Sequence, residues 1–288
     1  MLLSKKLSVI DMKLYWKHFM TAIAALSAAA TLLTVLFPLD FIKVKWLYGA
    51  IGTIIVLAGS FAYACGQTRS KKKIVLTLSS ELKLSILEGN IFEQKGVICI
   101  PFNEYFDTHV GDGVVGENTL HGRFINKYFK DRLDELNTKI QNGLPSDGYE
   151  IHKRRQDYCP NKKYKLGTCV DIRDGENLYV LFALTHFDEN DKASISRGEY
   201  TEVIRKLIQH LDDVVEDRAV YMPLFGTGLS RLKRTSQRIL LHIVDSIDFN
   251  DTCSIPGGIH VVIKSLSDVG VNLTGLEYIV KKGITEID

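Results

Sequence analysis

Two long uncharged apolar runs near the start of the chain constrain its fold more than any other feature. They span Phe19–Phe37 and Trp46–Gln67, and charged residues flank both. A helix of about 20 apolar residues crosses the hydrocarbon core of a bilayer. The few residues between the runs leave room only for a tight turn. The sequence therefore predicts a membrane module over residues 1–68, with transmembrane helices at about 19–39 and 46–67.

The positive charges indicate how this hairpin is oriented. Basic residues cluster before the first run and after the second, at Lys5, Lys6, Lys13, Lys17, Arg69, Lys71, Lys72 and Lys73. Only Lys43 and Lys45 lie in the turn. Positively charged flanks stay on the cytoplasmic side. We expect a multi-pass protein of the inner (plasma) membrane with both termini in the cytoplasm.

Other interpretations of the N-terminal region stay open. Small residues near Ala28 resemble a signal-peptide cleavage site, although Asp11 is unusual in a signal peptide. Leu3, Leu7, Ile10 and Leu14 recur at helical spacing, which fits a surface helix or an extension of the first span.

The apolar runs also contain small residues at close spacing. They are Ala24 and Ala28, Ala25 and Ala29, Gly49 and Gly52, and Gly59 with Ser60. Small side chains let helices approach closely in lipid, where apolar burial alone gives no driving force. The pattern fits a homo-oligomer assembled through these helices, and it also fits a plain anchor with alanine as filler.

Charge and cysteine content exclude several classes of protein. The net charge is +2, but residues 1–73 hold ten Lys/Arg against two acids, so the remainder is acidic. A mildly acidic soluble region argues against nucleic-acid binding. The five cysteines are scattered and odd in number, which fits a reducing compartment and no disulfide framework. Their spacing lacks the close pairs of a zinc site, so we expect no metal and no cofactor.

The rest of the chain, residues 73–288, alternates strands and helices. Strands are predicted at 73–78, 83–87, 96–101, 168–172, 178–184, 219–225 and 259–264. Helices are predicted from Thr119 through Leu133, at about 195–216, and at 235–246, and a polar loop spans 142–165. Strands separated by helices indicate an α/β fold, with a mixed sheet covered on both faces as a three-layer α/β/α domain. The role of residues 268–288 stays open.

Two glycine-containing loops are the best candidates for a binding site. Gly111–Gly116 precedes a predicted helix, and Phe225–Ser230 joins a predicted strand to a helix. Glycine lets backbone N–H groups converge on an anion, and a helix N-terminus adds a favourable dipole. Gly111–Gly116 also matches G-x-G-x-x-G, but it does not directly follow its strand, and Asp131 and Asp134 fall on a helical pattern. A pair of facing loops that grips a diphosphate fits better than a dinucleotide fold.

From about Ile86 to Lys264 the chain resembles the macro domain family, whose α/β/α fold binds ADP-ribose. The resemblance rests on four segments: Gly89–Ile91, Val97–Asn103, Gly111–Gly116 and Tyr221–Leu229. It implies that Asn90 and Ile91 hold adenine and that Asn103 lies near the distal ribose. The first diphosphate loop would comprise Gly111, Asp112, Gly113, Val114, Val115 and Gly116, and the second Phe225, Gly226, Thr227, Gly228 and Leu229.

The two-span N-terminus together with this domain resembles the membrane effectors of Thoeris anti-phage defence. In that family a TIR-domain enzyme makes an ADP-ribose-like signal from NAD, and the effector binds it, oligomerises and disrupts the membrane. Asn90 departs from the usual aspartate, and Phe106 replaces an asparagine and could pack on a base or ribose. Glu104 and Asp107 form no recognisable catalytic pattern, so we expect a receptor. The alternative is a membrane-anchored ADP-ribosyl hydrolase.

Overall fold

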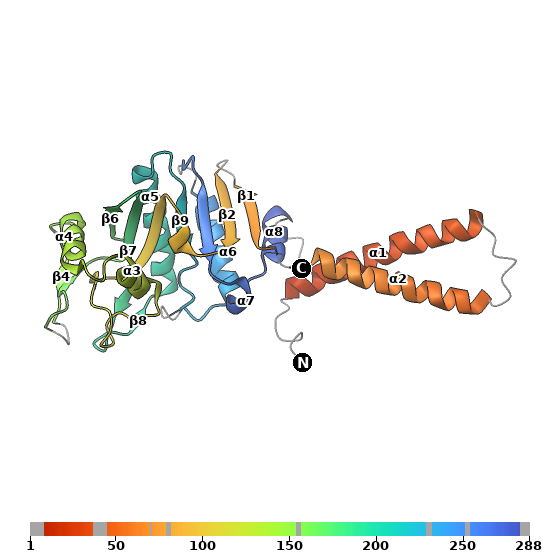
Figure 1. The fold of residues 1–288 in the computed structure, drawn as a ribbon, viewed down its shortest axis with the longest axis horizontal. Helices are drawn as coiled ribbons and strands as arrows, with labels where there is room; N and C mark the ends of the chain where they lie inside the picture. The colour runs from red at the N-terminus through yellow and green to blue at the C-terminus, as the bar shows by residue number, and fades with distance from the viewer. Residues whose placement is uncertain are drawn as a thin grey trace. The chain divides into compact units, whose positions relative to one another are not determined.

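The computed structural model describes residues 9–36, 45–69, 71–78, 82–153, 157–228, 232–250 and 254–282. The chain divides into two compact units. One consists of Lys72–Val271, and the other joins the N-terminal helices to the segment after Val271. Figure 1 shows the elements of both, a sheet flanked by helices and a hairpin of two long helices.

The larger unit is built on one mixed sheet with the strand order β1-β2-β10-β9-β3-β7-β6. Its strands are β1 (Lys73–Thr77), β2 (Lys83–Glu88), β3 (Val97–Asn103), β6 (Cys169–Asp174), β7 (Asn177–Phe187), β9 (Val220–Pro223) and β10 (Ile259–Ile263). The two outer strands β1 and β6 are antiparallel to their neighbours, and the five inner strands are parallel. β8 (Ala193–Ser194) pairs with the end of β7. The expected mixed sheet is confirmed.

Helices cover both faces of this sheet. Almost every residue of β3 and of β7 is buried, as is typical of inner strands covered on two sides. The helices of this unit are α3 (Leu120–Tyr128), α4 (Leu133–Gly143), α5 (Arg197–Val214), α6 (Ser236–Asp248) and α7 (Leu266–Val269). α3 packs against β3, whereas α5 packs against β7 and α6. The short 3₁₀ helix η1 (Ile91–Glu93) follows β2.

The single helix predicted from Thr119 through Leu133 is wrong, because the structure breaks it into α3 and α4. Arg132 lies at the break. Its guanidinium donates to the carbonyl of Tyr128 (2.7 Å) and to both carboxylate oxygens of Asp174 in β6 (3.1 and 3.2 Å). These bonds satisfy the end of α3 and fix the start of α4 on the sheet.

The predicted polar loop 142–165 is mostly irregular, with one local pairing. β4 (Glu150–Ile151) and β5 (Lys162–Lys163) form a two-residue antiparallel ladder of their own. The chain returns to the main sheet at β6. This excursion matters for the site, because it brings the basic residues Lys163 and Lys165 back toward the end of β3.

The second unit contains α1 (Val9–Leu36), α2 (Lys45–Gln67) and α8 (Leu273–Lys282). α1 is continuous from Val9, so within the described residues the N-terminal segment extends the first helix. α1 and α2 pack along a seam where Ala22, Ser60 and Ala64 are buried. Among the described residues one stretch, Gly49–Gln67, is long and apolar enough to cross a membrane, with a mean hydropathy of 1.6. The first apolar run continues past Leu36, outside the described residues.

The C-terminal helix α8 is held at the base of this hairpin. Thr274 Oγ1 donates to the carbonyl of Arg69 (2.8 Å), and Lys71 Nζ pairs with Glu277 (2.6 Å). Lys17 of α1 donates to the hydroxyl of Tyr278 (3.3 Å). The sequence boundary counted residues from 73 onward as one domain, whereas the structure groups α8 with the two N-terminal helices.

A close backbone contact before α3 provides a test of the fold. A Cβ atom on Gly122 would lie 2.3 Å from the carbonyl oxygen of Gly116. We expect Gly122→Ala to lower the free energy of unfolding by about 1–3 kcal/mol, since the backbone must shift. Gly198→Ala in α5, where nothing lies within 4 Å, is the matched control and should be neutral or slightly stabilising. Denaturant titration in detergent measures both, and equal stabilities would contradict the close contact.

Candidate functional site

The strand order reverses between β3 and β9. The two strands are parallel neighbours, with Val97 opposite Val220 and Ile98 opposite Tyr221. After β3 the chain continues to β6 and β7 on one side, and after β9 it continues to β10 on the other. Such a reversal of direction opens a crevice outside the carboxyl ends of the strands, where open α/β sheets bind ligands. The second glycine loop follows β9 closely, and the first comes after β3 with residues 104–110 in between.

The first loop is a tight turn with a left-handed tip. The N–H of Val114 donates to the carbonyl of Gly111 (2.9 Å), and Asp112 and Gly113 both have positive φ, 49° and 80°. This is a type I′ turn, for which Asp-Gly is a favoured pair. The Asp112 carboxylate accepts a hydrogen bond from His109 Nε2 (2.9 Å). The turn therefore has a fixed shape without any ligand.

The first loop is anchored by two buried valines and by the N-cap of α3. Val114 and Val115 are buried in a small apolar cluster with Cys159. Gly116 leads into α3, whose N-cap Thr119 donates to the carbonyl of Gly116 (2.6 Å) and accepts from the N–H of Gly122 (3.0 Å). The two valines thus support the loop from the interior.

The second loop packs on an aromatic cluster through its first residue, Phe225. The ring of Phe225 packs against Phe182 and Tyr200, with centroids 5.2 and 5.5 Å apart. Gly226 has a φ of 88°, and a Cβ there would lie 2.8 Å from the rings and methyls of Tyr200 and Leu232. Thr227 and Gly228 are exposed, and Leu229 lies outside the described residues. The tip of the turn is therefore open, and its base is rigid.

Asn90 and Ile91 lie at the same edge of the sheet, after β2. Asn90 caps η1: its Oδ1 accepts from the N–H of Phe92 (3.2 Å) and its Nδ2 donates to Glu93 (2.8 Å). Ile91 is buried. The ring of Phe92 packs on Tyr128 of α3, and Lys127 lies over it. η1 is thereby joined to the helix that follows the first loop.

Asn103 and Phe106 are both buried within the chain. The amide of Asn103 donates to Asp107 (2.9 Å), and its Oδ1 accepts from the N–H of Tyr105 (3.0 Å). Asn103 thus shapes the turn after β3. Phe106 is 2% exposed and packs between Phe102 and Tyr164. Ligand contact by either side chain stays a prediction, and it requires that side chain to leave its present partners.

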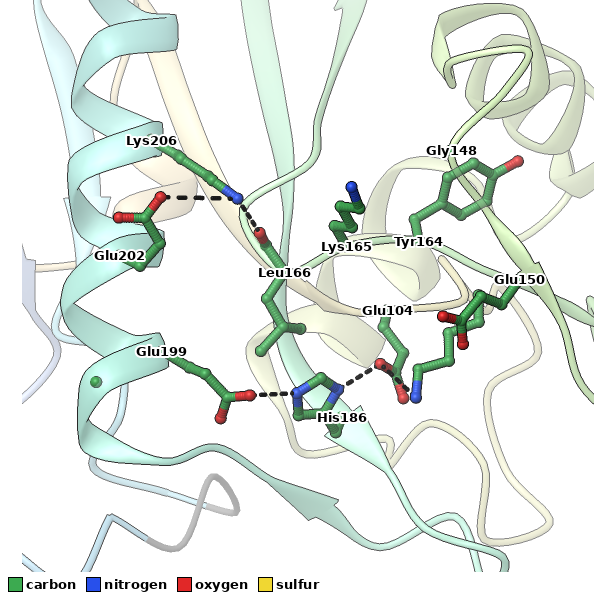
Figure 2. Close-up of a pocket in the computed structure, with 12 residues that line it drawn as sticks. Glu104, Gly148, Glu150, Tyr164, Lys165, Leu166, His186, Glu199, Glu202 and Lys206 are labelled. Carbon is green, nitrogen blue, oxygen red and sulfur yellow. Dashed lines mark hydrogen bonds and ion pairs between the residues drawn. The ribbon is translucent and has the colours of Figure 1, made fainter.

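A cluster of three charged side chains, Glu104, His186 and Glu199, was not predicted from the sequence. It lies where β3 and β7 end, and Figure 2 shows it. His186, near the end of β7, donates from Nδ1 to Glu104 (2.5 Å) and from Nε2 to Glu199 of α5 (2.9 Å). Glu104 follows Asn103 directly, is fully buried, and also lies 3.5 Å from Lys163 Nζ. These residues line a cavity of about 550 Å³ together with Lys206.

Hydrogen bonding sets the ionisation of this cluster. Capping bonds from Ser196, with the His186 bond next in importance, lower the pKa of Glu199 to about 2. Burial acts to lower the pKa of His186, but its bonds to Glu104 and Glu199 outweigh burial and raise that pKa above the ordinary value. Since both ring nitrogens are engaged, His186 is an ion-pair partner and not a free general base.

One part of the cluster does have a sequence signal. Ser196 and Glu199 form the S-x-x-E capping box at the start of α5, and both of its hydrogen bonds are present. Nothing in the sequence links Glu199 to Glu104, which lies on a different element. Among the described residues, no group of three or more His, Cys, Asp or Glu side chains is placed to hold a metal ion.

Comparisons with known proteins agree with this geometry. The family described as Thoeris protein ThsA, macro domain, matches residues 84–264. A curated relative, Thoeris protein ThsA of Bacillus amyloliquefaciens (strain Y2), is 28% identical over 176 residues, which cover 59% of this chain. The match spans 58% of that relative's length.

One solved structure supports the same fold at low sequence identity. A mutant of the Oceanobacillus iheyensis macrodomain matches with a TM-score of 0.50 and 13% identity, covering 74% of this chain and 100% of that one. Another mutant of that macrodomain, with ADPR, has a TM-score of 0.48 at 13% identity, covering 73% and 100%.

The depressed pKa of Glu199 gives a pH test of the cluster. A carboxylate with a lowered folded pKa stabilises the fold above its ordinary pKa of 4.5 and loses that effect as the pH falls toward about 2. We expect Glu199→Gln to be less stable than the wild type at neutral pH and to lose less stability in acid. Glu176→Gln, at an exposed ion pair with Lys95, is the control. Parallel stability curves for Glu199→Gln and the wild type would contradict the assignment.

Proposed function

Since this chain belongs to the Thoeris ThsA macro-domain family, we propose that it acts in anti-phage defence as a membrane effector gated by an ADP-ribose-derived signal. The signal is the product that a TIR-domain enzyme makes from NAD. The macro unit, residues 72–271, is the receptor, and the helical hairpin is the effector. The effector lies in the inner membrane with both termini in the cytoplasm, where the signal is made.

The observation that carries this proposal is the position of the two glycine loops. The second follows β9 closely and the first comes after β3, beyond residues 104–110, and these two strands are parallel neighbours where the strand order reverses. Loops so placed can direct backbone N–H groups at one ligand from two sides, and the start of α3 adds the positive end of a helix dipole. A diphosphate is the group that such a pair of loops recognises.

A receptor fits the residues near the crevice better than a hydrolase does. Hydrolysis needs an acid or base within reach of a bound water. Glu104 and Asp107 are fully buried. Glu104 is bound to His186 and to the N–H of Phe187, and Asp107 accepts from Asn103. We therefore propose that ligand binding, and not bond cleavage, is the event that this site performs.

The outer surface of the hairpin supports a membrane location. Only 11% of the apolar stretch Gly49–Gln67 is buried within the protein. Large apolar side chains point outward on both helices, among them Leu32, Leu33, Ile54 and Ile55. A core helix of a soluble protein buries such residues, whereas a bilayer solvates them. We propose that both helices cross the membrane as a hairpin.

Exposed small residues on the hairpin support oligomerisation. Ala24, Ala25, Ala28 and Ala29 lie outside the seam between α1 and α2, and they are exposed, as are Gly49 and Gly52. A second hairpin can therefore approach closely along these faces. The ligand shifts the equilibrium toward assembly only by its differential affinity for the two states.

α8 is our candidate for the element that couples the two units. Both ends of the macro unit continue directly into the hairpin unit, at Lys71 and at Asn272. α8 is bound to residues at the base of both helices, through Thr274, Glu277 and Tyr278. A change in the macro unit can therefore act on the hairpin at two points.

Substitution of Gly228 tests the ligand site. The residue is exposed with nothing within 4 Å of an added Cβ, so replacement leaves the fold intact. We expect Gly228→Asp to weaken ADP-ribose binding by at least about tenfold, because its carboxylate faces the diphosphate. Gly228→Ser is the neutral control and should bind within a few-fold of wild type. Calorimetry on the full chain in detergent measures both. Unaltered affinity in Gly228→Asp places the diphosphate elsewhere.

A charge in the apolar stretch tests the membrane location. We expect Ile55→Asp to release a large share of the chain from membranes during alkaline extraction, since an aspartate at mid-helix costs about 2.5–3.5 kcal/mol. Val75→Asp, at a similarly exposed apolar position in β1, is the control and should leave the chain in the membrane fraction. Extraction of the unmodified chain into the soluble fraction would refute the membrane assignment.

A further inference from the structure

The cluster around His186 extends to the second glycine loop through α5. Glu199, which accepts from His186, is followed directly by Tyr200 at the start of this helix. The Tyr200 hydroxyl donates to the carbonyl of Phe225 (2.9 Å), and its ring contacts the space where a side chain on Gly226 would go. The first turn of α5 therefore contacts both groups, the cluster through Glu199 and the second loop through Tyr200.

The cluster ties three separate elements to one another. Glu104 comes at the end of β3, His186 near the end of β7, and Glu199 from α5. The N–H of Glu104 donates to the carbonyl of Thr185 (3.0 Å), and its carbonyl accepts from the N–H of Tyr164 (2.9 Å), so the backbone there is fixed too. If α5 rotates or tilts, the bond from His186 to Glu199 or the bond from Tyr200 to Phe225 must break.

The positions of two carboxylates around the His186 ring favour a positively charged histidine. An ionised carboxylate can only accept hydrogen bonds, and both ring nitrogens face carboxylate oxygens. The ring must therefore hold two protons when both acids are ionised. The nearest other charge is Lys163 of β5, which lies 3.5 Å from Glu104. Around the cavity stand Lys165 of the following loop, Glu150 of β4, and Glu202 and Lys206 of α5.

Lys206, Glu202 and Glu150, which also line the cavity, each have other partners. Lys206 donates to the carbonyl of Leu166 (3.1 Å) and lies 3.8 Å from Glu202, which also pairs with Arg205. Glu150 pairs with His152. Loss of the charge on His186 therefore leaves two carboxylates, one of them fully buried, and Lys163 is the cation paired with Glu104 in the part of the chain that the structure describes. That is an expensive state for the buried Glu104.

We propose that Glu104, His186 and Glu199 form a positioning network that holds α5, and through Tyr200 the second glycine loop, in the geometry that receives the diphosphate. This inference rests on the proposed function, since it concerns the same ligand site. None of the three residues touches the ligand. They act through the carbonyl of Phe225 and the closely packed Gly226.

The network makes ligand affinity depend on pH in one direction. The pKa of His186 is raised, so the ring is charged below about pH 6.5 and loses its proton as the pH rises through the raised value. The network is complete at the lower pH. ADP-ribose affinity therefore falls as the solution becomes more alkaline, while the sheet stays folded.

Two substitutions with matched controls test the proposal. Tyr200→Phe removes the hydroxyl that binds Phe225, and His186→Gln removes the charge. Tyr179→Phe, at a buried tyrosine of β7, and His210→Gln, at a histidine paired with Asp171, are the controls. Calorimetry with ADP-ribose on the full chain at about pH 6 should show about fivefold weaker binding for the two test variants than for the wild type. At about pH 9, where His186 of the wild type has lost its charge, His186→Gln should bind like the wild type. Only His186→Gln should lose the pH dependence.

A second measurement tests the loop without any ligand. Hydrogen exchange of the backbone amides in residues 225–228, expressed as protection factors, reports how firmly the loop is held. We expect protection to be higher at about pH 6 than at about pH 9 in the wild type and both controls, and to drop in Tyr200→Phe and His186→Gln.

The outcomes separate this proposal from the proposed function. Unchanged protection and unchanged affinity in both test variants would overturn the network. If the protection factors behave as expected but the wild type does not bind ADP-ribose, the network stands and the proposed ligand is wrong.

Discussion

The parallel pairing of β3 with β9 is the interaction on which the rest of the structure depends. It pairs the first residues of two strands that are distant in sequence, at the point where the strand order reverses. β3 is almost fully buried, and Val220 and Met222 of β9 are buried, so the apolar core fixes the register of the pair. The loops that follow inherit their separation from this register.

The two units use apolar residues in opposite ways. In the macro unit, the inner strands β3 and β7 bury nearly all their side chains. In the hairpin, a narrow seam of Ala22, Ser60 and Ala64 is buried, while residues such as Ile54 and Ile55 face outward. The first arrangement suits water and the second suits lipid. The proposed function assigns ligand recognition to the macro unit and membrane action to the hairpin, and α8 groups with the hairpin.

Much of the fold was predictable, because local patterns decide it. The apolar segment Val97–Asn103 favours a buried strand, and the pair Asp112-Gly113 favours a tight turn, whatever the rest of the chain does. The break between α3 and α4 was missed, because Leu133 continues the apolar spacing while Arg132 is recruited by the distant Asp174. The pairing of Glu104, His186 and Glu199 was missed for the same reason. Their contacts arise only when β3, β7 and α5 assemble, and no spacing along the chain encodes that.

The central claim is that occupation of the crevice by a nucleotide diphosphate drives the hairpin to open the membrane. The most direct measurement is dye release from liposomes that contain the full chain, with the macro unit facing outward. The account predicts that ADP-ribose, or the product that a TIR-domain enzyme forms from NAD, increases dye release. It also predicts that Gly228→Asp liposomes do not respond to the same ligand. Equal release with and without these nucleotides, in liposomes where binding is shown to occur, would contradict it.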